Sequence, residues 1–295
     1  MTSLFAVNIA TAASLNHISG MHGVGSGSCG SSPAYVVTSS NSLSGSVLND
    51  GSANCSTSAM AAAGGGYVGI MASIEALSGG SGTTKVNARS TINDLYVTAA
   101  ATYDPAKLLA THGAVIPITV RAHAAGQVSV AHGIRSAYAQ SRLFGDLRIN
   151  GAGQSGNTTA FSRTVGVGPA GFSFSETDSI GAILTAGDII NWSRPFSVSM
   201  SMFGDVFANT AYPFGAGINS ADAHINAFNS LSFATLGPVF ILPEGFTVNS
   251  VEANIVNNRW IDPRVSAVPI PAAIWLFGSG LMGLLGFSRR KRQTI

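Results

Sequence analysis

Two acidic residues on one segment carry the clearest suggestion of enzyme chemistry in this sequence. Glu176 and Asp178 lie two residues apart, so on a β-strand they would face the same side, about 7 Å from each other. Two carboxyl groups at that spacing are compatible with glycoside hydrolysis by inversion. Together with Asp188 they also offer oxygen ligands for Ca²⁺, although no calcium-loop motif surrounds them. Acids spaced in this way on an exposed loop are common, so we predict no metal site and no cofactor.

The six histidines show no pattern of a catalytic or metal site. None forms a His-x-x-x-His pair, and none has an acid at metal-ligand spacing. His132 with Asp146, or His123 with Asp104, are the pairs that could meet across strands. A hydrogen-bonded histidine in a sheet is the simpler interpretation of each. We therefore predict that the protein is not an enzyme.

Aromatic residues in the second half of the chain suggest a different chemistry, which is carbohydrate binding. Trp192, Phe203, Phe207, Tyr212 and Phe214 fall at the ends of expected strands and in turns. Sugar rings stack on exposed aromatic side chains, so these residues could form a glycan-binding face. Aromatic residues in a β-sandwich are more often core, and the sequence favours that interpretation.

Cys29 and Cys55 are the only cysteines. In an exported chain an even number predicts one disulfide, here closing a loop of 25 intervening residues. Such a bond would remove roughly 3 kcal/mol of loop entropy from the unfolded state. Two buried free thiols are the alternative, and neither cysteine has a second Cys or His at zinc-ligand spacing.

Composition excludes several classes of protein. Charged residues make up only 9% of the chain against 46% hydrophobic residues, with 35 glycines. This is the composition neither of a typical cytosolic enzyme nor of a disordered acidic tail. Four of the 15 cationic residues lie in the last seven positions, so the rest carries 11 cations against 13 acids. Nucleic acid is therefore not an expected partner.

The elements that must position these residues are β-strands. Several segments are rich in β-branched and small residues and are bounded by Gly, Asn-Asp or Asp-Pro. They are residues 85–90, 94–103, 115–125, 127–132 and 134–147. Residues 134–147 also fit a helix, but their neighbours favour a strand. Pro117 places the start of its segment at a sheet edge, and residues 59–63 are expected to form one helical turn.

Beyond residue 159 the two-residue alternation becomes sharper. Phe196, Val198, Met200 and Met202 alternate with serines and should bury one face of a strand, and residues 223–233 repeat the pattern. Residues 238–242 and 246–250 flank a turn and predict a hairpin. Short strands without long helices between them predict an all-β fold, an antiparallel jelly-roll-like β-sandwich.

The C-terminus contains the only span long enough to cross a membrane. Residues 265–288 carry no charge, and 24 residues suffice for a ~30 Å hydrocarbon core. They predict one C-terminal transmembrane helix, whose spaced glycines would let another membrane helix approach, and a basic stop-transfer tail at the cytoplasmic end. The helix residues singled out are Ala273, Trp275, Phe277, Gly280, Gly283 and Gly286. The basic residues are Arg289, Arg290, Lys291 and Arg292.

The segment before this helix carries a resemblance. Val268, Pro269, Ile270, Pro271 and Ala272, followed by the apolar helix and the basic tail, resemble the PEP-CTERM protein-sorting domain. The similarity is to the variant whose signature reads Val-Pro-Leu-Pro-Ala. It implies recognition by exosortase, an integral-membrane transpeptidase, with a transient stay in the inner membrane. The tail would then be removed during transfer to the cell surface or the exopolysaccharide matrix. Ile270 replaces the Glu of the name-giving signature, so which sorting enzyme reads it stays open.

The N-terminus agrees with export and completes the expected organisation. Within residues 1–12 a short apolar run, Leu4 to Ala10, is followed by an Ala-Thr-Ala pattern at Ala10 to Ala12. This suggests a remnant or truncated signal peptide, although no cation precedes it; a buried strand is the alternative. Residues 13–82 would be a Gly- and Ser-rich region with the disulfide, and 83–256 the β-sandwich ectodomain. Residues 257–267 would be a linker, and 268–295 the sorting signal.

The function expected from these observations is that of an exported bacterial surface or matrix protein. Its role would be structural or adhesive and non-catalytic, with an exosortase-type enzyme, the inner membrane and exopolysaccharide as partners. A lectin-like carbohydrate-binding module is the alternative, and a carbohydrate-active enzyme the weaker one. Exposed aromatic rings would favour the first of these alternatives, and a cleft with paired acids the second.

Overall fold

A computed structural model describes residues 15–24, 35–39, 43–52, 55–77, 79–133, 138–151, 158–167, 174–210 and 220–265. These residues form sixteen strands and one helix, α1 (Pro105–His112). The first nine strands are β1 (Leu15–Val24), β2 (Tyr35–Ser39), β3 (Leu43–Ser52), β4 (Cys55–Gly64), β5 (Tyr67–Ala76), β6 (Ser81–Ala99), β7 (Val115–His132), β8 (Tyr138–Asn150) and β9 (Thr158–Val167). The others are β10 (Phe174–Asn191), β11 (Phe196–Asn209), β12 (Ala221–Phe233), β13 (Phe240–Ile241), β14 (Phe246–Asn249), β15 (Ile255–Val256) and β16 (Arg259–Trp260).

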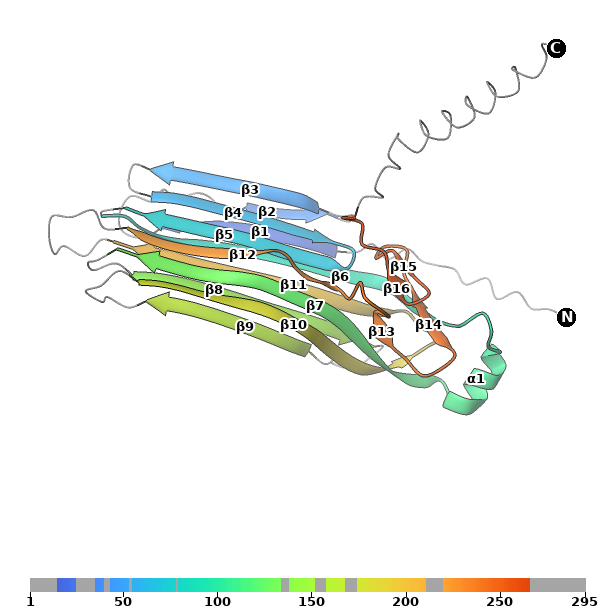
Figure 1. The fold of residues 1–295 in the computed structure, drawn as a ribbon. Helices are drawn as coiled ribbons and strands as arrows, with labels where there is room; N and C mark the ends of the chain where they lie inside the picture. Colours follow the sequence, from blue (N-terminus) through green and yellow to red (C-terminus); the bar gives the residue numbers. More distant parts are fainter. Residues whose placement is uncertain are drawn as a thin grey trace, which may run out of the picture. The chain divides into compact units, whose positions relative to one another are not determined.

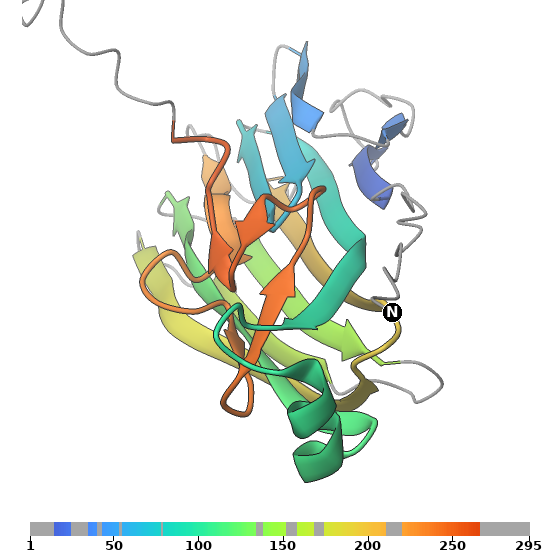
Figure 2. The ribbon, with the colours of Figure 1, turned by 90° about the vertical axis from the view of Figure 1, so that its right-hand side faces the viewer.

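Most of these strands belong to two seven-stranded antiparallel sheets (Figure 1). Sheet A has the order β2-β1-β6-β11-β8-β9, with β14 pairing the end of β6. Sheet B has the order β10-β7-β12-β5-β4-β3, with β13 pairing β7. A view along the strands shows the sheets as two layers (Figure 2). The predicted all-β, antiparallel class is confirmed.

The chain crosses repeatedly between the two layers. From β5 to β12 each strand lies in the sheet opposite its predecessor, except that β8 and β9 are neighbours in sheet A. The first and last strands of this run, β5 and β12, pair with each other in sheet B. Residues far apart in the sequence therefore stand side by side across each sheet.

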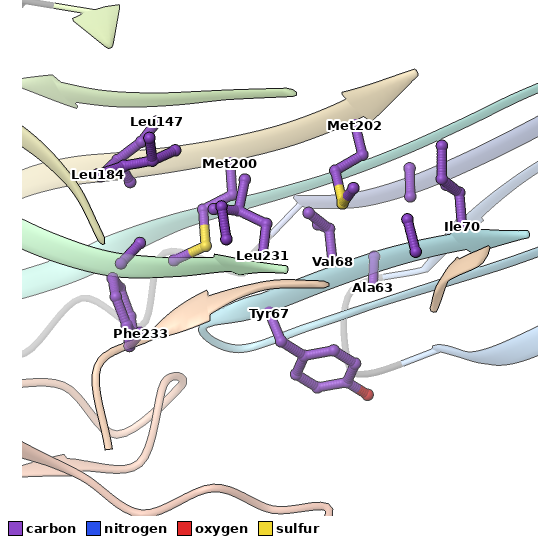
Figure 3. Close-up of a cluster of buried hydrophobic side chains, with 14 of the residues drawn as sticks. Ala63, Tyr67, Val68, Ile70, Leu147, Leu184, Met200, Met202, Leu231 and Phe233 are labelled. Carbon is purple, nitrogen blue, oxygen red and sulfur yellow. The ribbon is translucent and has the colours of Figure 1, made fainter. Parts of the chain in front are cut away.

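Side-chain alternation explains why these segments are strands and where the core lies. On β11, Phe196, Val198, Met200 and Met202 are buried to 4% exposure or less, as predicted. Met200 and Met202 point from sheet A toward the side chains of sheet B, including Leu231 on β12 (Figure 3). Because successive side chains of a strand point to opposite faces, the intervening residues of β11 form the outer face of sheet A.

Gly204 on β11 lies close to side chains of the opposite sheet. A Cβ built at this position would lie 2.9 Å from the Cδ1 atoms of both Ile70 and Ile225, which belong to sheet B. Carbon atoms in contact prefer about 3.5–4.0 Å, so a larger residue would force the layers apart. The glycine therefore permits the isoleucines of β5 and β12 to fill the centre of the core.

Helix α1 connects β6 to β7 at one end of the sheets (Figure 1). Its N-cap is Asp104, whose Oδ1 accepts a hydrogen bond from the backbone N–H of Ala106 at 2.9 Å, and Pro105 follows in the first turn. The helix ends at Gly113, which has φ 74° and donates its N–H to the carbonyl of Leu109. Only Leu108 of this helix is buried.

The chain after β12 closes the end of the core. Trp260 is buried, its ring packs edge-on against Phe233 at 6.0 Å, and its Nε1 donates to the carbonyl of Gly65. The carboxylate of Asp94, also buried, accepts from Ser250 Oγ at 2.5 Å and from the next two backbone N–H groups. We call Asp94 and residues 250–252 the carboxylate clamp, since it ties the C-terminal segment to β6.

Several sequence predictions are confirmed in their outline and corrected in their details. The two segments expected over 85–103 join in the single strand β6, which ends at Ala99, and the two over 115–132 form β7. The ambiguous segment 134–147 is strand over its described part, in β8. Pro117 pairs only with β10, because the pairing of β7 with its other neighbours ends at Thr119. Pro117 therefore lies at a sheet edge, as predicted.

Two local predictions were wrong. Residues 59–63 lie in strand β4, not in a helical turn, because β3 and β5 pair with it on both sides. The segments around the turn at 243–245 are strands, but β13 pairs β7 in sheet B whereas β14 pairs β6 in sheet A. The expected hairpin is therefore a crossover between the two layers.

The structure also bears on the expected division of the chain. The described part of 13–82 includes β4 and β5, which lie in the same sheet as β7 and β12. Within the expected linker, Trp260 is part of the core. The chain separates into two compact units between Ile261 and Asp262. In the second, Asp262 forms an ion pair with Arg264 at 2.7 Å.

Candidate binding face

The outer face of sheet A carries two exposed aromatic rings side by side. Phe203 on β11 stands directly opposite Phe144 on β8, and the two residues are 38% and 41% exposed. Side chains at such positions have Cβ atoms about 4.5–5.5 Å apart. Adjacent exposed rings surrounded by polar residues offer a small apolar surface that a ligand can cover.

Charged residues frame this aromatic pair along the strands. One position away on the same face, Asp205 stands between Lys85 on β6 and Arg142 on β8. On the other side of the pair, Ser201 stands between Arg89 and Asp146. The face thus combines apolar rings with cations and hydrogen-bonding groups, a mixture that can hold a polar ligand with apolar ring faces.

The hydrogen bonds of this face are few, which leaves its donors available. Ser201 Oγ donates to Asp146 Oδ2 at 2.7 Å. The Oδ1 atom of Asp205 is buried and has no hydrogen-bond partner among the described residues. Within the described residues, the side chains of Lys85 and Arg142 also make neither an ion pair nor a hydrogen bond.

Two further aromatic residues extend the face. Phe207 on β11 packs against Tyr138 on β8, with ring centroids 5.5 Å apart and an interplanar angle of 58°. Both are half-buried and belong to the outward set of their strands. We call the outward residues of β6, β8 and β11 the binding face.

The acids singled out from the sequence lie at the edge strand β10 and do not form a cluster. Asp178 forms an ion pair with Arg163 on β9, Nε to Oδ2 3.3 Å, which links the edges of the two sheets. Asp188 accepts the backbone N–H groups of Gly151 and Ile189. It lies ten residues from Asp178 along one strand, which is roughly 33 Å, so the structure does not bring it together with Asp178 and Glu176.

The aromatic residues singled out divide into three groups. Phe203 and Phe207 are on the binding face, whereas Trp192 packs against Phe246 at 5.4 Å and donates its Nε1 hydrogen to the carbonyl of Gly113. Tyr212 and Phe214 lie outside the described residues. Sequence reasoning missed Phe144, although it follows Gln140 and Arg142 at a spacing of two residues and therefore shares their outward face of β8.

The two histidine–aspartate pairs that could have met across strands are not formed. His132 is buried on the inner side of sheet B with Nδ1 2.8 Å from the carbonyl oxygen of Gly133, whereas Asp146 faces outward on sheet A. His123 is exposed on β7, and Asp104 caps α1. Among the described residues no three His, Cys, Asp or Glu side chains gather where they could hold a metal ion.

Most residues of the predicted sorting signal fall outside the described part. The structure covers none of 266–295, so Val268 to Ala272, the predicted transmembrane helix and the basic tail remain sequence predictions. In the part that is described, no helix has the length and apolar character needed to cross a membrane. Cys55 is disulfide-bonded, and Cys29 lies outside the described residues, so their pairing stays a prediction.

Comparison with known proteins found no match: no protein-family model matches the chain, and no curated protein matches it.

Proposed function

We propose that this chain is an exported bacterial protein of the cell surface or exopolysaccharide matrix, with an adhesive, non-catalytic role. The support for export is in the sequence: the Val-Pro-x-Pro segment, the uncharged span and the four terminal cations occur in the order of a PEP-CTERM sorting signal. An exosortase-type enzyme would read that signal while the inner membrane holds the precursor. Four cations, residues 289–292, follow the span directly, against Arg259 and Arg264 before it, and this bias favours a cytoplasmic tail.

We further propose that the body is a jelly roll. In a jelly roll, eight strands form two four-stranded sheets through two Greek keys. The eight strands β5 to β12 support this assignment, because they stand in the order β5-β12-β7-β10 in one sheet and β6-β11-β8-β9 in the other. Numbered one to eight, these are the orders 1-8-3-6 and 2-7-4-5. Such domains serve widely as rigid supports for binding surfaces, including those of lectins.

Binding of carbohydrate through the binding face is the adhesive activity that we propose. The observation that carries it is the pair Phe144 and Phe203, exposed and adjacent on two central strands of sheet A. Sugars have apolar faces that stack on aromatic rings and hydroxyl groups that need hydrogen-bond partners. The aromatic pair offers rings for stacking, and the polar residues around it offer hydrogen-bond partners.

The test is affinity electrophoresis of the purified protein through gels that contain single polysaccharides. We expect retardation by at least one of them and its loss in the double variant Phe144→Ala with Phe203→Ala. Truncating aromatic residues at the centre of a binding surface typically costs more than about 1 kcal/mol each. Leu236→Ala is the control, since Leu236 is 88% exposed and lies in the segment between β12 and β13. Equal retardation of the double variant and the wild type would exclude the binding face.

A further inference from the structure

We propose that the ligand of the binding face is an anionic polysaccharide, one that carries carboxylate groups along an extended chain. This inference rests on the proposed function and names the class of its ligand. It comes from the distribution of charge over the two sheets, not from the aromatic pair.

The binding face concentrates the positive charge of an otherwise slightly acidic body. Its outward positions hold four cations, Lys85, Arg89, Arg142 and Arg148, against two acids, Asp146 and Asp205. The chain before residue 266 has 11 cations against 13 acids, a net charge of −2, whereas this face has +2. A polyanion that approaches the body is therefore attracted to this face.

The four cations are not used within the described structure. Their side chains make no ion pair and no hydrogen bond in the part of the chain that the structure describes. By contrast, Arg163 and Arg264 elsewhere are both paired with acids. A cationic side chain without a partner on a face of exposed rings can bind a carboxylate without first breaking an internal contact.

The spacing of the cations fits a polymer better than a single sugar. Arg142 and Arg148 lie six residues apart on β8, which is roughly 20 Å. Lys85 and Arg142 flank β11 from the two sides, roughly 10 Å apart in the plane of the sheet. A chain lying along β8 would meet Arg142, Phe144, Asp146 and Arg148 in turn, because all four lie on the outward face. The one acid among them already accepts a hydrogen bond from Ser201.

The outer face of sheet B provides the contrast. There Glu75 on β5 stands directly opposite Asp222 on β12, which puts two like charges side by side. Arg121 on β7 is the only Lys or Arg among the outward residues of the described central strands of this sheet. The two outer faces of one body therefore differ in sign, and only the face that carries the aromatic pair is basic.

Asp205 allows a test of the sign of the ligand's charge. It is an acid between two cations, and an anionic ligand bound there is repelled by its charge. Asp205→Asn should therefore strengthen binding, by about twofold. Lys85→Gln with Arg142→Gln should weaken it, by roughly fivefold at low salt, because each exposed contact contributes less than about 1 kcal/mol. A purely structural role would not give opposite effects for the two variants.

The experiment compares two polymers that share one backbone. Binding of the full chain, purified in detergent, is measured to polygalacturonate and to its methyl ester, which lacks the negative charges. We expect tighter binding to the acid form and weaker binding as salt rises from low to physiological concentration, because mobile ions screen exposed charges. Lys107→Gln is the matched control, since it removes one exposed cation from α1 instead of from the binding face. Arg142→Lys keeps the charge and should keep the affinity, which separates the effect of charge from a folding defect.

Each other outcome overturns the inference in a recognisable way. Equal binding to both polymers, lost on removal of the aromatic pair, would leave the proposed carbohydrate binding standing and reject an anionic ligand. Absence of binding to both polymers rejects the anionic ligand directly. Retention of the protein on another, neutral polysaccharide would then show that the proposed function had survived. Equal binding to double-stranded DNA, with the same salt dependence and no effect of Phe144→Ala, would show a general affinity for polyanions.

Discussion

The carboxylate clamp offers the sharpest test of what holds the C-terminal segment to the body. Asp94 lies on β6 and is only 6% exposed. Its Oδ1 accepts from Ser250 Oγ at 2.5 Å, and its Oδ2 accepts from the N–H groups of Val251 and Glu252 at 2.9 and 3.0 Å. Asp94→Ala removes these acceptors from one buried hydroxyl and two part-buried N–H groups.

The magnitude follows from the number and kind of hydrogen bonds. A hydrogen bond to a charged group contributes about 1.5–3 kcal/mol, and a buried donor left without an acceptor costs about 1–3 kcal/mol. The contributions are not additive, because water can reach the vacated site and Ser250 Oγ also accepts from the N–H of Ala253. We therefore expect Asp94→Ala to lower the free energy of unfolding by about 3–5 kcal/mol, a large part of the 5–15 kcal/mol of a typical domain. Asp94→Asn retains one acceptor oxygen and should cost about half as much.

Urea unfolding followed by circular dichroism measures this difference. The midpoint should fall while the slope with urea stays unchanged, because the surface exposed on unfolding is the same. Asp104→Ala is the control: Asp104 also accepts a backbone N–H, but it caps an exposed helix, and such a change costs about 1 kcal/mol. If Asp94→Ala cost no more than Asp104→Ala, the burial argument for the clamp would be wrong.

Three other predictions address charge, the disulfide and sorting. Burial and the neighbouring Glu75 carboxylate raise the pKa of Asp222, with a smaller opposing effect of His224, so stability should fall as pH rises through that raised pKa. Asp222→Asn should flatten this fall in unfolding free energy measured against pH. Digestion without reductant should yield one linked peptide pair containing Cys29 and Cys55, and free thiols on the exported protein would contradict it. Pro269→Ala with Pro271→Ala should leave membrane-held protein in cell fractions, and unchanged maturation would favour a plain tail anchor.

The sequence predicted the strands whose environment is simplest. Phe196 to Met202 alternate strictly between large apolar residues and serine, and β11 lies in the middle of sheet A with its inner side against sheet B. Burial alone then determines which side chains face inward. The same reasoning failed at residues 59–63, where alanine and methionine fit both helix and strand, and pairing with β3 and β5 decided for strand.

The incorrect prediction of a hairpin over residues 238–250 has a different cause. Residues 238–250 have the local pattern of two strands around a tight turn, and local pattern carries no information about which sheet each strand joins. In the structure Phe240 pairs with Val120 and Phe246 with Ala99, so partners more than 100 residues away determine the connection. Neither pairing could be predicted without the register of the long strands β6 and β7.

The sequence indicated only part of the binding face, for the same reason. Phe203 was recognised as an aromatic residue that could face solvent, but its neighbour Phe144 lies 59 residues earlier in the chain. Only the register of β8 against β11 places the two rings together, and the same register places Asp205 between its two cations. Candidate sites that consist of residues on adjacent strands depend on pairings that one sequence does not specify.

Strand alternation also separates the residues that hold the fold from those that we assign to binding. On β8, Leu143 and Leu147 point into the core and are 1% exposed or less, whereas Arg142, Phe144 and Arg148 point outward. Replacing an outward residue creates no cavity, and surface substitutions usually change stability by less than about 0.5 kcal/mol. Variants of the binding face should therefore unfold at wild-type urea concentrations even where they no longer bind. A loss of binding in such a folded variant is evidence about the ligand, and the core of sheet A provides the stability that makes this separation measurable.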